Sequence, residues 1–336
     1  MTSRIRIQAT STPNPASRRA ARATGWALAA ALLLTTLPGD ARAWCFWNCS
    51  YAKTKYPIVL AHGFLGADSY LGILDYWYGI ESYIEDKGGT VYVTEVSPAN
   101  SSAARGEHLI AQLDQIRAIR GAPTLKFNLI GHSQGGLDVR YVAGVRPDLV
   151  ASLTTVGSPH TGIDLVDQFG GGLAGMQGLI AFLGDAVELL WGLLGNDNPT
   201  DMLAALETFS PAAMAAFNTH PVFGQGMPAI PCGEGAAVSS TPAGPRRNYS
   251  WTGDTPYTNA LDILDPLFLI SSLLYDEAND GLVPVCAAHF GDVLRDDYRM
   301  NHLDEVNQLL GLTALFETDP RDVFRTHANR LKNAGL

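Results

Sequence analysis

Apolar and polar positions alternate along the chain in two ways. Four runs rich in β-branched and aromatic residues predict strands: YPIVLAHG (56–63), TVYVTEV (90–96), LKFNLIGH (125–132) and VASLTTVGSP (150–159). Residues 105–119 instead carry apolar side chains three and four positions apart, which predicts a helix that Gly121 and Pro123 end. Strands that alternate with helices are typical of a mostly parallel sheet with helices on both faces.

The C-terminal half has a weaker pattern. Residues 232–248 (CGEGAAVSSTPAGPRRN) are rich in turn formers, which predicts a surface loop. No internal repeat and no long low-complexity linker divides the sequence. We therefore expect one domain over residues 44–336, interrupted by an insertion.

The first 43 residues differ in composition from the rest. The apolar run WALAAALLLTTL (26–37) is followed by the small residues ARA (41–43) and preceded by five arginines, Arg4, Arg6, Arg18, Arg19 and Arg22. This order predicts a secretory signal peptide over residues 1–43, cleaved after Ala43. A membrane anchor is the alternative, but a bilayer span needs about 20 apolar residues and this run is shorter.

Composition and charge narrow the function classes. Hydrophobic residues make up 46% of the chain and charged residues 17%, which is enough apolar content for a substantial α/β core. The formal net charge is −10, and the segment before the cleavage site holds six of the arginines, so the remainder is more acidic still. Because phosphate binding requires a basic surface, nucleic acid is not an expected partner.

All four cysteines, Cys45, Cys49, Cys232 and Cys286, follow the predicted cleavage site. An oxidising compartment allows disulfides, and four cysteines permit three pairings, one of which joins Cys45 to Cys49 and Cys232 to Cys286. Trp44 is too large for the residue that precedes a lipid-modified cysteine. The spacings also fit no tetrahedral zinc site.

The sequence GHSQG (131–135) places Ser133 between a predicted strand and the helix-like stretch GLDVRYVAGV (136–145). A G-x-S-x-G pattern in this context predicts a nucleophile elbow, where the glycines allow a strained turn and close packing. The serine hydroxyl then projects near a helix N-terminus, which favours negative charge. A chance match is the alternative in a chain with 34 glycines, but the flanking elements argue against it.

A nucleophilic serine requires a base and an acid, which follow it in the order Asp or Glu, then His. His302, in NHLDEVNQLLG, lies late in the chain at a predicted turn before a helix, whereas His160 comes too early and is interpreted as structural. The other later histidines are His220, His289 and His327. Asp280, in the turn sequence ANDGLVP, is the preferred acid. Asp276 and Glu277 rank lower, and a solvated surface aspartate is the alternative interpretation of Asp280.

Oxyanion donors are expected from two backbone N–H groups. One is that of Gln134, directly after the serine, and the other comes from the loop after the first strand, AHGFLG (61–66). The N–H of Phe64 is the best candidate in that loop.

Seven segments resemble the family I bacterial triacylglycerol lipases, the foldase-dependent secreted class. They are YPIVLAHGFLG, GHSQGG, RYVAGVRPDLVASLTTVGSPH, CGEG, NDGLV, NHLDEVNQLLGL and RTHANRLKNAGL, and they run from Tyr56 to the C-terminus. The resemblance implies an α/β-hydrolase fold, a Ser133, Asp280 and His302 triad, a Cys232–Cys286 disulfide and a structural Ca²⁺ site. The early segment WCFWNCSYAKT, with Cys45 and Cys49, departs from the family pattern.

The implied calcium ligands combine spacing with resemblance. Asp304 and Gln308 are four residues apart, expected on one helix face, and the family site adds the carbonyl of Leu312 and an aspartate that matches Asp265. Hard oxygen ligands suit Ca²⁺, and the position of Asp304 near His302 implies an ion that holds the histidine loop. Asp262 competes with Asp265 for the last place. From spacing alone, a solvated helix face is the more common outcome.

The most apolar stretch after the signal peptide runs over residues 165–195. Glycines and acidic residues interrupt it, which argues against a membrane span and leaves buried helices or a mobile lid. The resemblance places a helical lid here, in an insertion over about 163–215.

Together the residues and the resemblance predict a secreted serine lipase that hydrolyses long-chain triacylglycerols through an acyl-enzyme. A carboxylesterase or polyester depolymerase of the same fold is the alternative, and a non-catalytic binding protein is a third class. The resemblance further implies export through the periplasm with a lipase-specific foldase, an acylglycerol substrate at a lipid–water interface, and a monomer.

Overall fold

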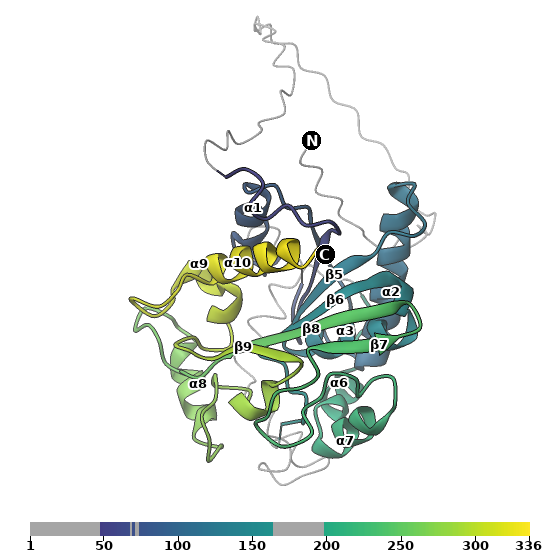
Figure 1. Cartoon of the computed structure of the whole chain (residues 1–336). Coiled ribbons are helices and arrows are strands. Elements are labelled where there is room, and N and C mark those ends of the chain that lie inside the picture. Colours follow the sequence, from purple (N-terminus) through teal and green to yellow (C-terminus); the bar gives the residue numbers. More distant parts are fainter. Residues whose placement is uncertain (1–47, 68, 71–73, 164–197) are drawn as a thin grey trace, which may run out of the picture.

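The computed structural model of the chain describes residues 48–67, 69–70, 74–163 and 198–336 (Figure 1). The strands are β1 (Ile58–Ala61), β2 (Ser69–Tyr70), β3 (Leu74–Asp75), β4 (Val91–Thr94), β5 (Phe127–His132), β6 (Val150–Val156), β7 (Val238–Thr241), β8 (Gly244–Gly253) and β9 (Asp292–Tyr298). The helices are α1 (Ile80–Glu85), α2 (Ser102–Ile119), α3 (Gln134–Val145), α6 (Met202–Thr208), α7 (Pro211–Thr219), α8 (Asp265–Ser272), α9 (Gln308–Gly311) and α10 (Pro320–Asn333). Three 3₁₀ helices complete the description: η1 (Pro147–Leu149), η2 (Val285–Ala288) and η3 (Asp304–Val306).

The main sheet has seven strands in the order β4-β1-β5-β6-β8-β7, and β9 also pairs with β8. Every pairing is parallel except that of β7 with β8. The four strands predicted from the sequence correspond to β1, β4, β5 and β6, and the predicted helix corresponds to α2. The side chain of Ser101 caps α2 by accepting the N–H of Ala104, so this helix begins three residues before the predicted start.

The prediction of a surface loop over residues 232–248 is wrong in part. Residues Val238–Thr241 form β7, which pairs antiparallel with the start of β8 at the edge of the sheet. The turn formers at residues 241–244 make the hairpin turn, where Gly244 has φ +101°. An edge hairpin of serine, threonine and arginine lacks the apolar alternation that marks buried strands.

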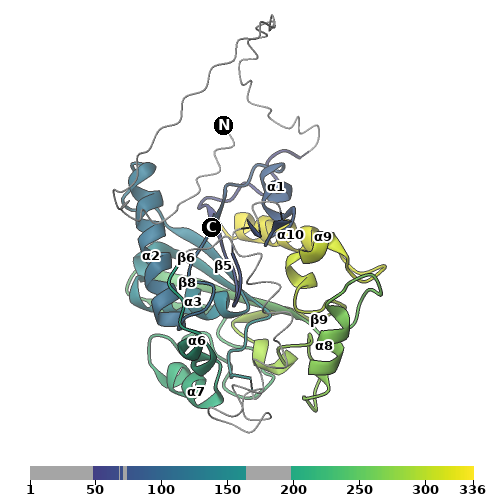
Figure 2. The ribbon, with the colours of Figure 1, turned by 180° about the vertical axis from the view of Figure 1, so that it is seen from behind.

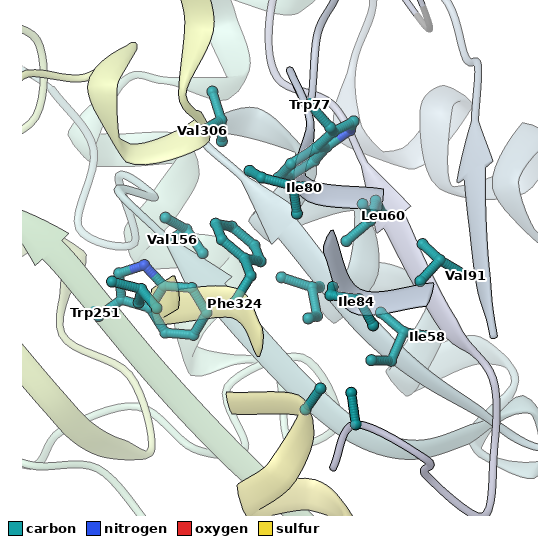
Figure 3. Packing of buried hydrophobic residues seen from close by; sticks show 14 of the residues in the cluster. Ile58, Leu60, Trp77, Ile80, Ile84, Val91, Val156, Trp251, Val306 and Phe324 are labelled. Atoms are coloured by element: carbon teal, nitrogen blue, oxygen red, sulfur yellow. The ribbon is translucent and has the colours of Figure 1, made fainter. Parts of the chain in front are cut away.

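Helices cover both faces of the sheet, as predicted (Figures 1 and 2). Successive residues of β1 point to opposite faces: Ile58 and Leu60 pack against α1 and α10, and Val59 and Ala61 pack against α2 and α3. Figure 3 shows the first of these layers, where Phe324 of α10 lies beside Trp251 of β8. Both core layers are buried, which holds the carboxyl ends of the strands in fixed relative positions.

The predicted insertion is described only at its end. Residues 164–197 of the predicted lid lie outside the described residues, whereas α6 and α7 are described. Their apolar side chains Leu206 and Met214 pack with Leu137 of α3, and Phe64 contacts the edge of the Phe209 ring. The predicted signal peptide also lies outside the described residues. Within the part of the chain that the structure describes, no helix is long and apolar enough to cross a membrane.

Candidate active site

Ser133 lies at a sharp turn from β5 into α3. Its backbone has φ 54° and ψ −126°, a conformation that L-residues rarely adopt, and its N–H donates to the carbonyl of Val156 on β6 (2.9 Å). This is the strand–turn–helix context that the sequence predicts for a nucleophile elbow. Open α/β sheets bind ligands at the carboxyl ends of their parallel strands, and Ser133 lies at such an end.

The glycines around Ser133 are required by packing. A Cβ on Gly131 would lie 2.2 Å from the carbonyl oxygen of Gly135, and a Cβ on Gly135 would lie 2.2 Å from that of Ala61. On Gly136 it would lie 1.9 Å from Ser158 Oγ. Because these distances are far inside van der Waals contact, α3 packs this closely against β1 and β5 only without side chains here.

His302 and Asp280 form a buried pair. Asp280 Oδ2 lies 2.6 Å from His302 Nδ1, and the N–H of His302 donates to the Asp280 carbonyl (2.9 Å). The other carboxylate oxygen accepts the N–H groups of Leu282 (2.8 Å) and Val283 (2.7 Å). A carboxylate only accepts, so His302 Nδ1 carries the proton and Nε2 keeps a lone pair. The pair has the arrangement that a general base and its orienting acid require.

The sequence candidates separate clearly. The structure brings His302 next to the elbow, since its ring lies 4.6 Å from that of His132, the residue before Ser133. Asp276 and Glu277, the lower-ranked acids, are exposed. His160 is buried, with its ring nitrogens bonded to Thr155 and Arg140, in keeping with a structural role.

The two predicted oxyanion donors flank the elbow. Gln134 is the first residue of α3, where an N–H has no partner within the helix. In the loop after β1, the N–H groups of Gly63, Leu65 and Gly66 donate to Tyr76, Pro98 and Gly63 respectively. The N–H of Phe64 has no acceptor among the described residues, so it remains open to an oxyanion.

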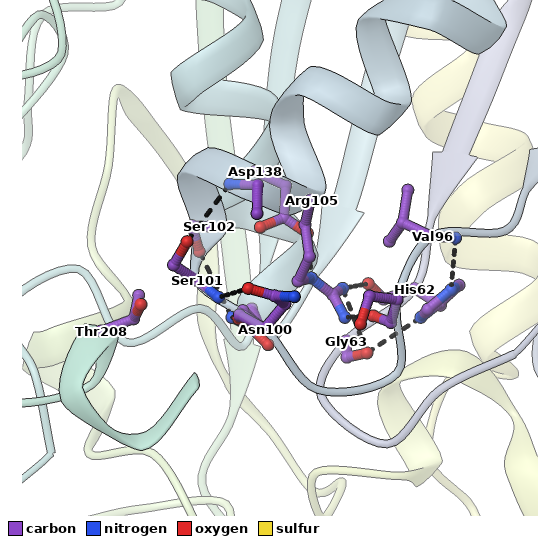
Figure 4. Close-up of polar contacts among 12 residues, drawn as sticks. His62, Gly63, Val96, Asn100, Ser101, Ser102, Arg105, Asp138 and Thr208 are labelled. Atoms are coloured by element: carbon purple, nitrogen blue, oxygen red, sulfur yellow. Dashed lines mark hydrogen bonds and ion pairs between the residues drawn. The ribbon is translucent and has the colours of Figure 1, made fainter. Parts of the chain in front are cut away.

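A buried arginine that the sequence analysis did not single out supports the loop after β1. Arg105 of α2 donates to the carbonyls of His62 (2.6 Å), Gly63 (3.2 Å) and Ser97 (2.5 Å), and pairs with Asp138 of α3 (2.7 Å; Figure 4). Burial raises the pKa of Asp138 to about 6, against the lowering effect of Arg105. In the sequence, Arg105 looks like one more charged residue of an amphipathic helix, so nothing local predicts that it supports this loop.

A second unpredicted group contacts His132: Glu305 Oε2 lies 3.4 Å from His132 Nε2. Glu305 is buried, and its Oε1 accepts the N–H of Gly253 (2.5 Å) and the hydroxyl of Thr252 (3.1 Å). Burial, and then the charge of Asp280, raise its pKa well above the usual range. Burial and then His302 lower the pKa of His132 well below its usual value, so this ring is neutral.

Curated proteins are similar in sequence to this chain over most of its length. A triacylglycerol lipase of Vibrio cholerae is 47% identical over 300 residues, which covers 85% of this chain and 90% of that protein. One of Burkholderia plantarii is 39% identical over 361 residues, covering 95% of this chain and 98% of that protein. This chain belongs to the triacylglycerol lipase family.

The fold agrees with membership of the triacylglycerol lipase family. Residues 56–183 match the alpha/beta hydrolase fold family. A Bacillus licheniformis lipase in its mature form has a TM-score of 0.54 at 19% identity, covering 83% of this chain and 93% of that one. A Staphylococcus hyicus lipase has the same TM-score at 16% identity, covering 84% and 97%. The predicted α/β-hydrolase fold is therefore confirmed.

Two of the implied calcium ligands of this lipase-family chain meet in a buried acidic cluster. Asp265 Oδ2 accepts the N–H groups of Thr258 and Asn259 (both 2.6 Å), and the Thr258 hydroxyl donates to Asp304 Oδ2 (2.6 Å). Asn301 Nδ2 also donates to Asp265 (2.6 Å). The pKa of Asp304 is raised to about 7, mainly by burial and in part by the charges of Asp265 and nearby Asp262.

The prediction that Asp304 and Gln308 share one helix face is wrong. Asp304 belongs to η3, Asn307 then takes a left-handed conformation (φ 60°), and Gln308 begins α9. The chain turns between the two residues, so helical spacing does not relate them. Gln308 is buried with its side-chain nitrogen unbonded within the described residues, and Leu312 caps α9.

A disulfide joins Cys232 to Cys286, as the family resemblance implies. Cys286 belongs to η2, which follows the Asp280 turn, so the bridge ties the segment before β7 to the loop of the acid. Cys45, which one of the three possible pairings joins to Cys49, lies outside the described residues.

Proposed function

We propose that this chain hydrolyses the ester bonds of long-chain triacylglycerols, with Ser133 as nucleophile, His302 as base and Asp280 as the orienting acid. The observation that carries the proposal is the buried Asp280–His302 pair beside a strained serine. The relatives named triacylglycerol lipase supply the substrate class.

In the proposed mechanism, hydrolysis proceeds in two acyl-transfer steps. His302 Nε2 takes the proton of the Ser133 hydroxyl as the serine attacks the ester carbonyl, and the N–H groups of Phe64 and Gln134 bind the oxyanion. His302 then protonates the departing alcohol, which leaves an acyl-enzyme on Ser133. Water, activated by the same histidine, releases the fatty acid. Asp280 holds the ring in place and stabilises the imidazolium that forms.

The substrate class is tested with a series of esters of increasing acyl length. We expect turnover to rise for long-chain triacylglycerols presented as an emulsion, above their solubility, because the proposed substrate is an insoluble lipid. A rate that is highest for short, soluble esters and falls at the emulsion boundary would instead support the carboxylesterase alternative. A high rate on a polyester film would support a depolymerase.

Export and assembly belong to the same proposal. The arginine-flanked apolar run and the ARA sequence support a signal peptide over residues 1–43, and the disulfide suits an oxidising compartment. We therefore propose secretion through the periplasm, with a lipase-specific foldase as partner and a monomeric mature enzyme.

We also propose that one structural Ca²⁺ binds at Asp265 and Asp304, together with Gln308 and the carbonyl of Leu312. Among the described residues, hydroxyl and amide donors contact the two buried carboxylates and no basic side chain does. Two buried acids without a cation repel each other, and hard oxygen donors are the ligands that Ca²⁺ prefers. The ion would hold the segment that carries His302, and the reaction itself requires no metal ligand.

Calcium removal should therefore destabilise the enzyme rather than stop it. Chelation should lower the melting temperature by several degrees, because a ligand at about 100 times its Kd contributes about 2.7 kcal/mol. Asp304→Asn removes one anionic ligand and should abolish the response to added Ca²⁺, whereas Asp276→Asn, at an exposed acid, should leave that response intact. Immediate loss of turnover on chelation with unchanged melting would contradict a structural ion.

A further inference from the structure

A chain of hydrogen bonds connects the loop after β1 to the loop of His302. The N–H of Gly63 lies 3.0 Å from the Tyr76 hydroxyl, which lies 2.6 Å from His132 Nδ1. His132 Nε2 lies 2.9 Å from the backbone carbonyl oxygen of His302. Tyr76, His132 and His302 are all buried. The chain thus passes from the oxyanion side of the site, beneath the elbow, to the base.

The direction of each bond follows from the acceptor at its end. The His302 carbonyl can only accept, so His132 Nε2 carries the ring proton and Nδ1 keeps a lone pair. Tyr76 must then donate its hydroxyl proton to Nδ1, and its oxygen lone pairs accept the N–H of Gly63. This arrangement satisfies all three contacts, and Glu305 Oε2, 3.4 Å from His132 Nε2, faces the same ring N–H.

Packing leaves this chain little freedom to shift. A Cβ on Gly63 would lie 2.9 Å from the Tyr76 hydroxyl and 2.7 Å from Ser133 Cβ, so the glycine contacts both. The Tyr76 ring lies 5.4 Å from that of Trp77, between centroids, and 5.8 Å from that of His132. Gly63 directly precedes Phe64, so the Tyr76 bond fixes the backbone immediately before the proposed oxyanion donor.

We propose that Tyr76 and His132 are positioning residues that hold the oxyanion loop and the base loop at a fixed separation on either side of Ser133. The inference rests on the proposed function. Gly63 follows β1, Tyr76 follows β3, His132 ends β5 and His302 follows β9. The hydrogen bonds join these four segments directly. A small displacement of an oxyanion donor or of the base costs much of the rate, since both act only in a narrow geometry.

The test is Tyr76→Phe, which removes one oxygen and keeps the ring. We expect kcat for an ester to fall by about tenfold or more while KM changes by less than about twofold, because the oxyanion is bound only in the transition state. Tyr249→Phe, at another buried tyrosine in the same core layer, is the matched control and should keep both constants near those of the unmodified enzyme. An unchanged kcat in Tyr76→Phe would overturn the proposal.

Variants of His132 separate its two contacts, one with Tyr76 and one with the His302 carbonyl. His132→Gln keeps an amide donor for the His302 carbonyl, and His132→Ala keeps neither contact. We expect His132→Gln to retain a higher kcat than His132→Ala. In the His132→Ala background, Tyr76→Phe should lower kcat little further, because the effects of coupled residues are non-additive. Effects that simply multiply would show independent roles and overturn the proposal.

The rate at which a phosphonate ester labels Ser133 distinguishes this proposal from the proposed function. An unmodified enzyme that is not labelled at Ser133 would refute the proposed function. An unmodified enzyme that is labelled, with Tyr76→Phe labelled equally fast, would refute only the positioning role. This comparison also holds if the His132 variants fail to fold.

Discussion

Ser133→Ala is expected to lower ester turnover by at least about 10⁴-fold, because it removes the only atom that the mechanism allows to attack the carbonyl. A small residual rate above that of water is consistent with oxyanion binding alone. The fold should survive, because the elbow depends on the glycines and on the Ser133 N–H bond to Val156, which alanine keeps. Turnover of an emulsified triacylglycerol and thermal melting measure the two effects.

Ser158→Ala is the matched control for that variant. Ser158 is also buried and lies just after β6, against Gly136 of the elbow helix. It has no role in the proposed chemistry, so its loss should leave most of the activity. Near-normal turnover in Ser133→Ala, or an equal loss in Ser158→Ala, would refute the elbow assignment.

Loss of the Cys232–Cys286 bridge is expected to lower the free energy of unfolding by about 2 to 5 kcal/mol. The bridge spans a sequence separation of 54, and such a loop gains much conformational entropy in the unfolded chain when the bond opens. Because Cys286 follows the Asp280 turn, activity should also be lost at a lower temperature than in the intact enzyme. Denaturant unfolding of the Cys232→Ser/Cys286→Ser double variant measures the change.

The reduced unmodified enzyme is the control for that double variant. Both should unfold at the same denaturant concentration, and reduction should cost the double variant little further. Unfolding curves that coincide with the oxidised enzyme would contradict a stabilising bridge. Peptide mapping that joins Cys286 to Cys45 or Cys49 would contradict the pairing itself.

The elements of the proposed active site were predictable because their sequence signals are local. A strand that turns sharply into a helix needs glycines near the turn, where side chains would clash. The G-x-S-x-G motif around Ser133, with a strand pattern before it and a helix pattern after it, therefore predicts the elbow directly. The order of acid and base along the chain then selects Asp280 and His302, which the structure joins.

The rest depends on contacts between distant segments. Arg105 reads as one more polar helix residue until α2 packs beside the loop after β1. Glu305 directly follows an expected calcium ligand, yet its buried carboxylate lies against His132. Spacing also misled the prediction for Asp304 and Gln308, because the left-handed turn at Asn307 breaks the helix that the spacing assumes. The hairpin over residues 238–247 is set by pairing at the sheet edge rather than by its own apolar pattern.

Covalent labelling with a long-chain phosphonate ester tests the central claim most directly. One equivalent should attach to Ser133, as mass spectrometry of the digested protein would show, and turnover of triacylglycerol should fall in proportion to the label. Labelling should be lost in Ser133→Ala and strongly slowed in His302→Ala, because the histidine activates the serine. Attachment at any other residue, or full turnover by the labelled enzyme, would contradict a Ser133–His302–Asp280 hydrolase.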